Sequence, residues 1–203
     1  MTRAAVPARL LWIVDRDALE NGSVPRALDG GVSWLHLRDT GVQAATWRRH
    51  LRDWSSGSRP VHGVVNGAPP WAREDRLGAH LKTSQPVLGR TERAAWSLLG
   101  RSVHDAAEVC AALKDRPDYL VAGPVFPTTS KPGHPGVGLA GLVSICAAAA
   151  TCPVLAIGGV GPADVPRILE VGAHGVAVRS GITDAADPAA AARAYLEVLP
   201  GDP

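Results

Sequence analysis

The chain has 203 residues, of which 46% are apolar, 4% aromatic and 20% charged, and its formal net charge is +2. A chain of this length and apolar content can bury a substantial core, which excludes disorder and makes one domain the simplest organisation. The near balance of basic and acidic residues excludes nucleic-acid binding driven by bulk electrostatics. We therefore expect a single domain over residues 1–203, with its core over about 10–199.

Short apolar runs alternate along the chain with segments that have helical features. The runs cover residues 10–14, 32–37, 61–65, 78–81, 99–103, 118–122, 154–157 and 175–178. Helices are predicted over 43–54, 105–113, 139–150, 162–171 and 188–199, with weaker candidates at 69–76 and 91–97. This alternation indicates βαβ units and a parallel sheet. Eight such runs predict an α/β fold, a (β/α)8 TIM barrel with short loops.

An open, doubly wound sheet is the competing fold. Its signature is a GxGxxG motif in the first turn between a strand and a helix. The first apolar run is instead followed by Asp15-Arg16-Asp17. The barrel is therefore the favoured interpretation.

The cysteines and the lengths of the apolar runs indicate the cellular compartment in which the protein is expected. No run reaches the roughly 7–15 apolar residues of a signal peptide, or the roughly 20 of a membrane helix. Cys110, Cys146 and Cys152 form no CxxC pair and no metal-ligand spacing, and such a sparse, odd set fits a reducing compartment. We expect a cytoplasmic protein without a membrane partner. Whether it forms a homo-oligomer is left open.

Two small-residue turns follow the last two predicted strands. Gly158 and Gly159 come after the seventh strand, and Arg179, Ser180 and Gly181 come after the eighth. Small residues let backbone N–H groups approach phosphate oxygens, and TIM barrels commonly bind phosphate at this position. The alternative is a pair of ordinary tight turns. We predict that these residues bind a phosphate group.

The longest irregular segment, residues 123–136, follows the sixth predicted strand. It carries Thr128, Thr129, Ser130 and Lys131, whose hydroxyl and ammonium groups suit an anionic ligand. We expect this loop to cover such a ligand, and a solvated surface loop is the alternative.

Further polar residues follow the second, third and fifth predicted strands. His36 and Arg38 share one strand face, and Arg38 suits a carboxylate or forms an ion pair with its neighbour. Asn66 suits a heterocycle or an ordinary Asn-Gly turn. Ser102 and His104 lie near the barrel mouth, and histidine is the usual acid or base at neutral pH. Structural or surface positions are assigned to His50, His62, His80 and His174.

The order of these motifs resembles the thiamine phosphate synthase/TenI family of small (β/α)8 barrels. The resemblance extends from about residue 10 to 199. It rests on Leu35-His36-Leu37-Arg38, Asn66, Gly78-Ala79-His80-Leu81, Gly100-Arg101-Ser102-Val103-His104, Gly123-Pro124-Val125-Phe126-Pro127-Thr128, Ile157-Gly158-Gly159-Val160 and Ser180-Gly181-Ile182.

The resemblance implies one of two activities, which differ in their need for a metal. The synthase joins an aminopyrimidine diphosphate to a thiazole phosphate with Mg²⁺ on the diphosphate. Its Gln and Lys after the second strand are replaced here by His36 and Thr40, and its acidic residues by Gly67 and Gln85. Because Mg²⁺ prefers carboxylates beside substrate phosphates, these losses argue against diphosphate chemistry. We expect no metal and no cofactor, with Mg²⁺ required only if the synthase alternative holds.

The favoured interpretation is a TenI-like thiazole tautomerase, an isomerase of thiamine biosynthesis whose small-molecule partner is a thiazole phosphate. A tautomerase moves one proton, and His104 and His36 are the candidates to carry it. The hydroxyls of residues 128–130 would bind the phosphate together with Gly158, Gly159, Arg179, Ser180 and Gly181.

Two departures favour the alternatives to a tautomerase. Pro124 stands where tautomerases of this type can carry a histidine, and Lys131 stands where synthases hold the diphosphate. The alternatives are therefore a transferase, thiamine phosphate synthase, and a non-catalytic protein that binds thiazole phosphate.

Overall fold

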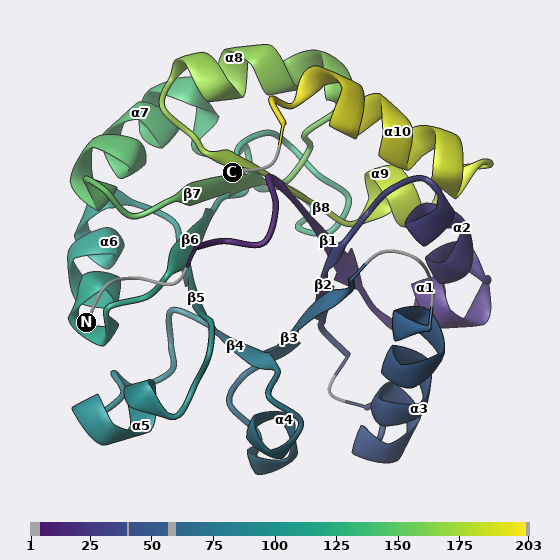
Figure 1. The fold of residues 1–203 in the computed structure, drawn as a ribbon. Helices are drawn as coiled ribbons and strands as arrows, with labels where there is room; N and C mark the ends of the chain where they lie inside the picture. Colours follow the sequence, from purple (N-terminus) through teal and green to yellow (C-terminus); the bar gives the residue numbers. More distant parts are fainter. Residues whose placement is uncertain (1–4, 40, 57–59, 202–203) are drawn as a thin grey trace.

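A closed barrel of parallel strands forms the centre of the molecule (Figure 1). The computed structural model describes residues 5–39, 41–56 and 60–201. Neighbouring strands pair in chain order, and β8 pairs with β1 to close the ring. The strands are β1 (Leu10–Val14), β2 (Trp34–Leu37), β3 (His62–Asn66), β4 (Gly78–Leu81), β5 (Leu99–Val103), β6 (Tyr119–Ala122), β7 (Val154–Ile157) and β8 (Gly175–Val178). The predicted TIM barrel is confirmed.

Helices surround the barrel on its outside (Figure 1). They are α1 (Arg16–Glu20), α2 (Ser23–Asp29), α3 (Ala44–Ser55), α4 (Pro70–Glu74), α5 (Arg90–Ala94), α6 (Ala106–Ala112), α7 (Gly138–Ala149), α8 (Val165–Glu170), α9 (Ser180–Thr183) and α10 (Pro188–Val198). Short 3₁₀ turns cover Leu113–Asp115 and Pro162–Asp164. The sequence analysis did not predict α1, α2 or α9, because segments this short carry little helical periodicity.

Local hydrogen bonds explain where several elements begin. Asp15 and Asp105 cap α1 and α6 by accepting hydrogen bonds from backbone N–H groups. The second strand begins at Trp34, two residues later than predicted. Val32 lies in the turn that follows α2, where its N–H donates to the carbonyl of Ala27 at 3.2 Å.

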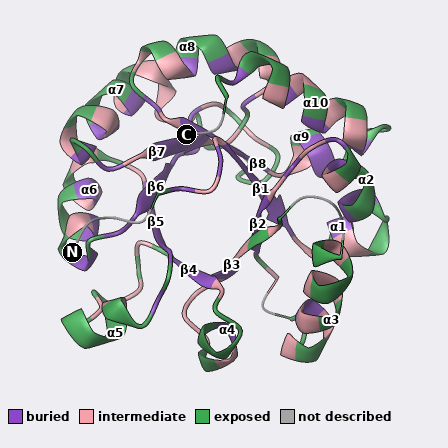
Figure 2. Cartoon of the chain, viewed as in Figure 1, coloured by how far each residue is buried: buried purple, intermediate pink, exposed green. Residues whose placement is uncertain are grey.

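The strands separate two apolar layers, and the helices carry most of the exposed surface (Figure 2). The inner layer fills the barrel and includes Leu11, Ile13, Trp34, Tyr119 and Leu155. Because side chains alternate along a strand, the inward position of Trp34 means that His36 also faces the interior. The register of the barrel thus decides which face of β2 carries the site.

Gly100 makes space inside the barrel for two larger polar side chains. A Cβ at this position would lie 2.2 Å from the Tyr119 ring and 2.4 Å from His80 Nδ1. Because Gly100 has no side chain, Tyr119 and His80 both fit inside the barrel beside it. In the described part of the chain, no helix is long and apolar enough to cross a membrane.

Candidate active site

A cavity of about 680 Å³ opens at the carboxyl ends of the strands. This volume suits a small molecule, and this end of the barrel is where TIM barrels carry their sites. The cavity brings together most of the predicted site residues, namely His36, Arg38, Asn66, Ser102, His104, Thr128, Ser130, Lys131, Gly158, Gly159, Arg179, Ser180 and Gly181.

Thr129 does not line this cavity. It borders an open depression on the other side of the same loop, together with Pro132 and His134. Conversely, the sequence analysis missed lining residues that include His80, Lys82, Thr83, Ser84 and Tyr195. His80, which the sequence analysis assigned to a structural or surface position, is buried and lines this cavity. Since Ala79 and Leu81 are apolar and face the helices, strand alternation could have placed His80 inside.

His36 and His80 form a buried pair at the base of the cavity. Their ring centres lie 4.7 Å apart, and both side chains are buried. His80 Nδ1 lies 3.1 Å from the Tyr119 hydroxyl, and its Nε2 lies 2.9 Å from Ser102 Oγ. His36 Nε2 is buried and has no hydrogen-bond partner among the described residues. This nitrogen can therefore form one hydrogen bond to a bound molecule.

Burial keeps this histidine pair uncharged at neutral pH. Desolvation, followed by the charges of Arg38 and Arg101, lowers the pKa of His80 to about 3. Desolvation, His80 and Arg38 lower the pKa of His36 well below its usual value. A proton carrier works best with a pKa near the operating pH. The lowered pKa of His36 therefore favours a hydrogen-bonding role over proton transfer.

His104 lies at the cavity mouth between an acidic and a basic side chain. Its Nδ1 lies 2.8 Å from Glu108 Oε2, and its Nε2 lies 3.3 Å from Lys131 Nζ. Glu108 Oε2 also accepts a hydrogen bond from the His104 N–H at 2.6 Å. This arrangement suits an Nδ1–H imidazole that donates to Glu108 and accepts from the Lys131 ammonium. Glu108 thereby orients His104, as a carboxylate orients many catalytic histidines.

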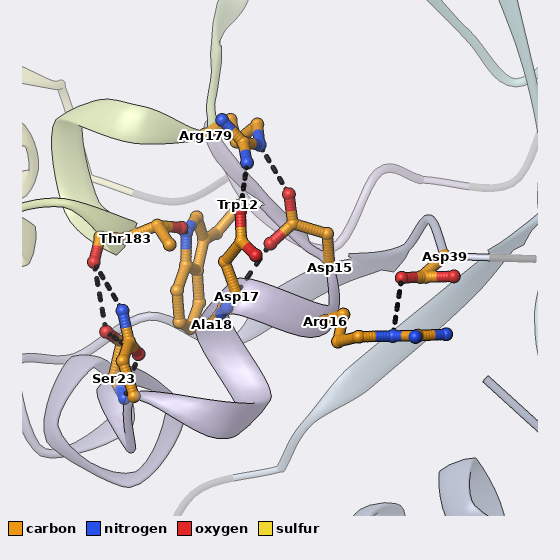
Figure 3. A network of polar contacts seen from close by, with 10 residues as sticks. Trp12, Asp15, Arg16, Asp17, Ala18, Ser23, Asp39, Arg179 and Thr183 are labelled. Atoms are coloured by element: carbon orange, nitrogen blue, oxygen red, sulfur yellow. Dashed lines mark hydrogen bonds and ion pairs between the residues drawn. The ribbon is translucent and has the colours of Figure 1, made fainter. Parts of the chain in front are cut away.

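Arg179 is held by the amino-terminal part of the chain. Its guanidinium is ion-paired with Asp15 and with Asp17, the second at 2.8 Å (Figure 3). The hydrogen bond to Asp15 raises the pKa of Arg179. Arg179 lines the cavity as predicted, but two carboxylates already balance its charge. Phosphate binding by Arg179 stays a prediction, and such a contact would compete with these two carboxylates.

The remaining cations of the cavity have no such partner. Arg38, Lys82 and Lys131 form no ion pair with any residue that the structure describes. They follow β2, β4 and β6, whereas the predicted phosphate turns follow β7 and β8. Because the barrel closes in chain order, β4 lies across the mouth from β8. Lys82 therefore lies across the cavity from the turn after β8, whereas β6, which precedes Lys131, is the neighbour of β7.

The glycines after β7 have a packing role that the sequence did not indicate. Gly158 and Gly159 have φ angles of 96° and 66°. A Cβ on Gly158 would lie 2.6 Å from Pro124 Cβ, and one on Gly159 would lie 2.4 Å from the Pro127 carbonyl oxygen. Both contacts are too close for any side chain. The absence of side chains at these two positions thus lets the loop after β6 pack against the end of β7. This packing role is separate from the predicted role in phosphate binding.

The residues of the cavity do not fit the Mg²⁺ site that the resemblance implies. No Asp or Glu is among the described residues that line it. A Cβ on Gly67 would lie 3.6 Å from Gln85 Nε2, so the two positions expected to be acidic are neighbours without a carboxylate. Gln85 Oε1 accepts the Lys82 N–H at 2.8 Å. Thr40 lies outside the described residues. The part of the chain that the structure covers holds no cluster of metal-ligating side chains.

The fold and this cavity define a TIM barrel with a cationic small-molecule site. The chain matches the thiamine monophosphate synthase family over residues 10–182, and it belongs to that family of thiamine biosynthesis. It is 42% identical over 194 residues to a thiamine-phosphate synthase of Mycobacterium sp. (strain KMS), covering 85% of this chain and 83% of that protein. It is 33% identical over 187 residues to a thiamine-phosphate synthase of Thermus thermophilus, covering 87% of each.

A solved structure supports the same assignment. The thiamine phosphate pyrophosphorylase from Pyrococcus furiosus superposes with a TM-score of 0.73 and 26% identity, covering 94% of this chain and 95% of that one. The family predicted from the motifs is therefore confirmed. These relatives are named for the synthase activity, so they favour the alternative of the sequence analysis over the tautomerase.

Proposed function

We propose that this protein is a thiamine phosphate synthase, a transferase that joins an aminopyrimidine diphosphate to a thiazole phosphate. The observation that carries the proposal is one cavity that brings Arg38, Lys82 and Lys131 together with the small-residue turns after β7 and β8. The two substrates of the synthase bring one diphosphate and one phosphate to the site. The identity with proteins named for this activity, at matching length, supports it.

In this reaction the thiazole nitrogen forms a bond to the methylene carbon of the aminopyrimidine. The bond from that carbon to the diphosphate oxygen breaks, and its electron pair leaves with the diphosphate. The products are thiamine phosphate and diphosphate, and no proton is lost or gained in the bond change. The protein therefore has to align the two rings and stabilise negative charge on the leaving group.

The lining residues divide between these two tasks. Lys82 and Lys131 face the diphosphate, where fixed positive charge favours its departure. Ser180 begins α9, and its backbone N–H lies in the first turn of that helix, which suits the thiazole phosphate. His36 and Asn66 offer hydrogen bonds to the heterocycles between the two anions.

Tautomerisation of a thiazole phosphate is a second candidate, favoured by one observation. Glu108 orients His104 at the cavity, and Nε2 would act as a general base once released from Lys131. In a tautomerase this nitrogen would remove a proton from one ring position and return it at another. Pro124, which lines the cavity, has no group to assist that transfer.

Product analysis by mass spectrometry tests the proposal against its competitors. The purified protein is incubated with both synthase substrates and, separately, with carboxythiazole phosphate. Thiamine phosphate is the expected product of the first incubation. Aromatisation without coupling would replace the proposal with the tautomerase, and saturable binding without any product would leave a non-catalytic binding protein.

Lysine variants connect such activity to the cavity. We expect Lys131→Ala to reduce the coupling rate at saturating substrates about tenfold or more, because it removes a charged contact to the leaving group. Lys114→Ala is the matched control, since Lys114 is exposed on the 3₁₀ turn and does not line the cavity. Equal rates in the two variants would contradict the role of Lys131.

A further inference from the structure

We propose that this site binds diphosphate through side-chain cations alone, so that its reaction needs no divalent metal ion. The inference rests on the proposed function for its substrate, but it concerns a separate property, the source of the positive charge. The described residues that line the cavity include no carboxylate, whereas the Mg²⁺ site that the family implies contains carboxylates.

Five carboxylates near this end of the barrel already have a partner among the described residues. Asp15 and Asp17 pair with Arg179, and Asp39 pairs with Arg16. Asp105 caps α6, and Glu108 binds His104. Mg²⁺ is usually held by one or two carboxylates together with substrate phosphates. Using any of these side chains for that purpose would break an existing ion pair or helix cap.

Contacts at His104 connect the loops that carry Lys82 and Lys131, and both lysines line the same cavity as Arg38. Thr83, next to Lys82, places its Oγ1 3.3 Å from His104 Nδ1, and Lys131 Nζ lies 3.3 Å from the other nitrogen of that ring. Arg38 acts electrostatically on His80, which is the second-last residue of β4. The loops after β4 and β6 thus meet at His104, and Arg38, which follows β2, is near enough to His80 of β4 to lower its pKa.

Both lysines belong to loops whose backbones are held in place. Arg101 donates to the carbonyls of Lys82 at 2.7 Å, Gln85 at 2.9 Å and Pro86 at 3.0 Å. Beyond Lys131, the N–H of Val137 donates to the Pro124 carbonyl at 2.8 Å, which closes that loop. Charges on fixed loops need little reorganisation when an anion binds or leaves. A diphosphate carries about three negative charges near neutral pH, which three such cations balance.

The test measures binding of inorganic diphosphate to the full-length protein by calorimetry, in EDTA and in excess Mg²⁺. We expect binding in EDTA, and weaker binding in Mg²⁺, because the metal reduces the charge of the ligand. Lys82→Ala and Lys131→Ala should each weaken binding in EDTA about tenfold or more, whereas Lys114→Ala should leave it unchanged. Lys82 and Lys131 are exposed, so these variants preserve the fold.

Three results would overturn the inference: binding that requires Mg²⁺, no binding in either condition, or equal binding by the Lys82, Lys131 and Lys114 variants. Coupling activity in the same two conditions separates the inference from the proposed function. Coupling that requires Mg²⁺ would keep the function and reject the inference. Metal-free binding of diphosphate without any coupling would reject the function and keep the inference.

Discussion

At the scale of single residues, Arg101 connects the stability of the barrel to the geometry of the site. It is buried, forms an ion pair with buried Asp115, and donates to three carbonyls of the loop that carries Lys82. Asp115 also accepts the N–H of Leu88 at 2.6 Å. The sequence identified Arg101 only as part of a family motif, because its ion-pair partner lies fourteen residues further along the chain.

We expect Arg101→Met to lower the free energy of unfolding by about 3–5 kcal/mol, because it leaves the Asp115 carboxylate buried without its counter-charge. Urea denaturation measures this loss. The double variant Arg101→Met/Asp115→Asn should lose less than the sum of the two single variants, since the residues interact directly. Additive losses would contradict the coupling.

The buried histidines make stability depend on pH. The pKa of His80 is about 3 in the folded protein, against 6.5 for an unperturbed histidine, and that of His36 is lowered for the same main reason, burial. As the pH falls below about 6.5, the unfolded chain binds protons that the folded chain does not. The free energy of unfolding should therefore decrease from about pH 6.5 toward pH 3, by up to about 1.4 kcal/mol per pH unit for each histidine.

Denaturation at several pH values checks this expectation. His80→Asn should flatten the slope below pH 6.5, because asparagine keeps a polar group beside Tyr119 but does not titrate. His62→Asn is the control, since His62 is exposed at the start of β3, outside the cavity. Equal slopes in the wild type and in His80→Asn would show that His80 is not the titrating group.

At the scale of elements, short segments after the strands position the site. Thr183 of α9 accepts a hydrogen bond from Trp12 Nε1 at 3.3 Å, and its carbonyl accepts from Asn21 and Ser23 (Figure 3). These bonds tie the helix that carries Ser180 to α1, α2 and β1. The sequence analysis did not predict α9, because four residues are too few to show helical periodicity. It did not predict these hydrogen bonds either, because the bonded residues lie some 160 positions apart in the chain.

The start of α6 offers a test at this scale. Asp105 caps the helix by accepting the N–H of Glu108 at 2.8 Å, and Glu108 in turn orients His104. We expect Asp105→Ala to lower the free energy of unfolding by about 1 kcal/mol. Asp105→Asn, which retains a capping oxygen, should lose much less. Similar losses in both variants, measured by thermal denaturation, would contradict the capping role.

At the scale of the whole molecule, the sequence predicted the barrel and the end of it that carries the site. The spacing of apolar residues predicts the strands and helices, because each of these elements buries one or both of its faces. The pairing of Arg179 with Asp15 and Asp17 could not be predicted in the same way, since it depends on closure of β8 onto β1. The packing role of Gly158 and Gly159 likewise depends on a neighbouring loop.

The near-neutral net charge of the chain conceals an uneven distribution. Basic and acidic residues are almost equal in number, yet the described cavity lining contains arginine and lysine and no carboxylate. The absence of acidic residues at Gly67 and Gln85 suggested a tautomerase when only the sequence was considered. Together with the relatives named as synthases, the same absence supports our proposal of a synthase site that supplies its own positive charge.

The stoichiometry of the coupling reaction tests this account most directly. The protein is incubated in EDTA with the aminopyrimidine diphosphate and thiazole phosphate, and released diphosphate and thiamine phosphate are quantified in the same samples. The account predicts equal amounts of the two products. Diphosphate without thiamine phosphate, or neither product, would contradict it.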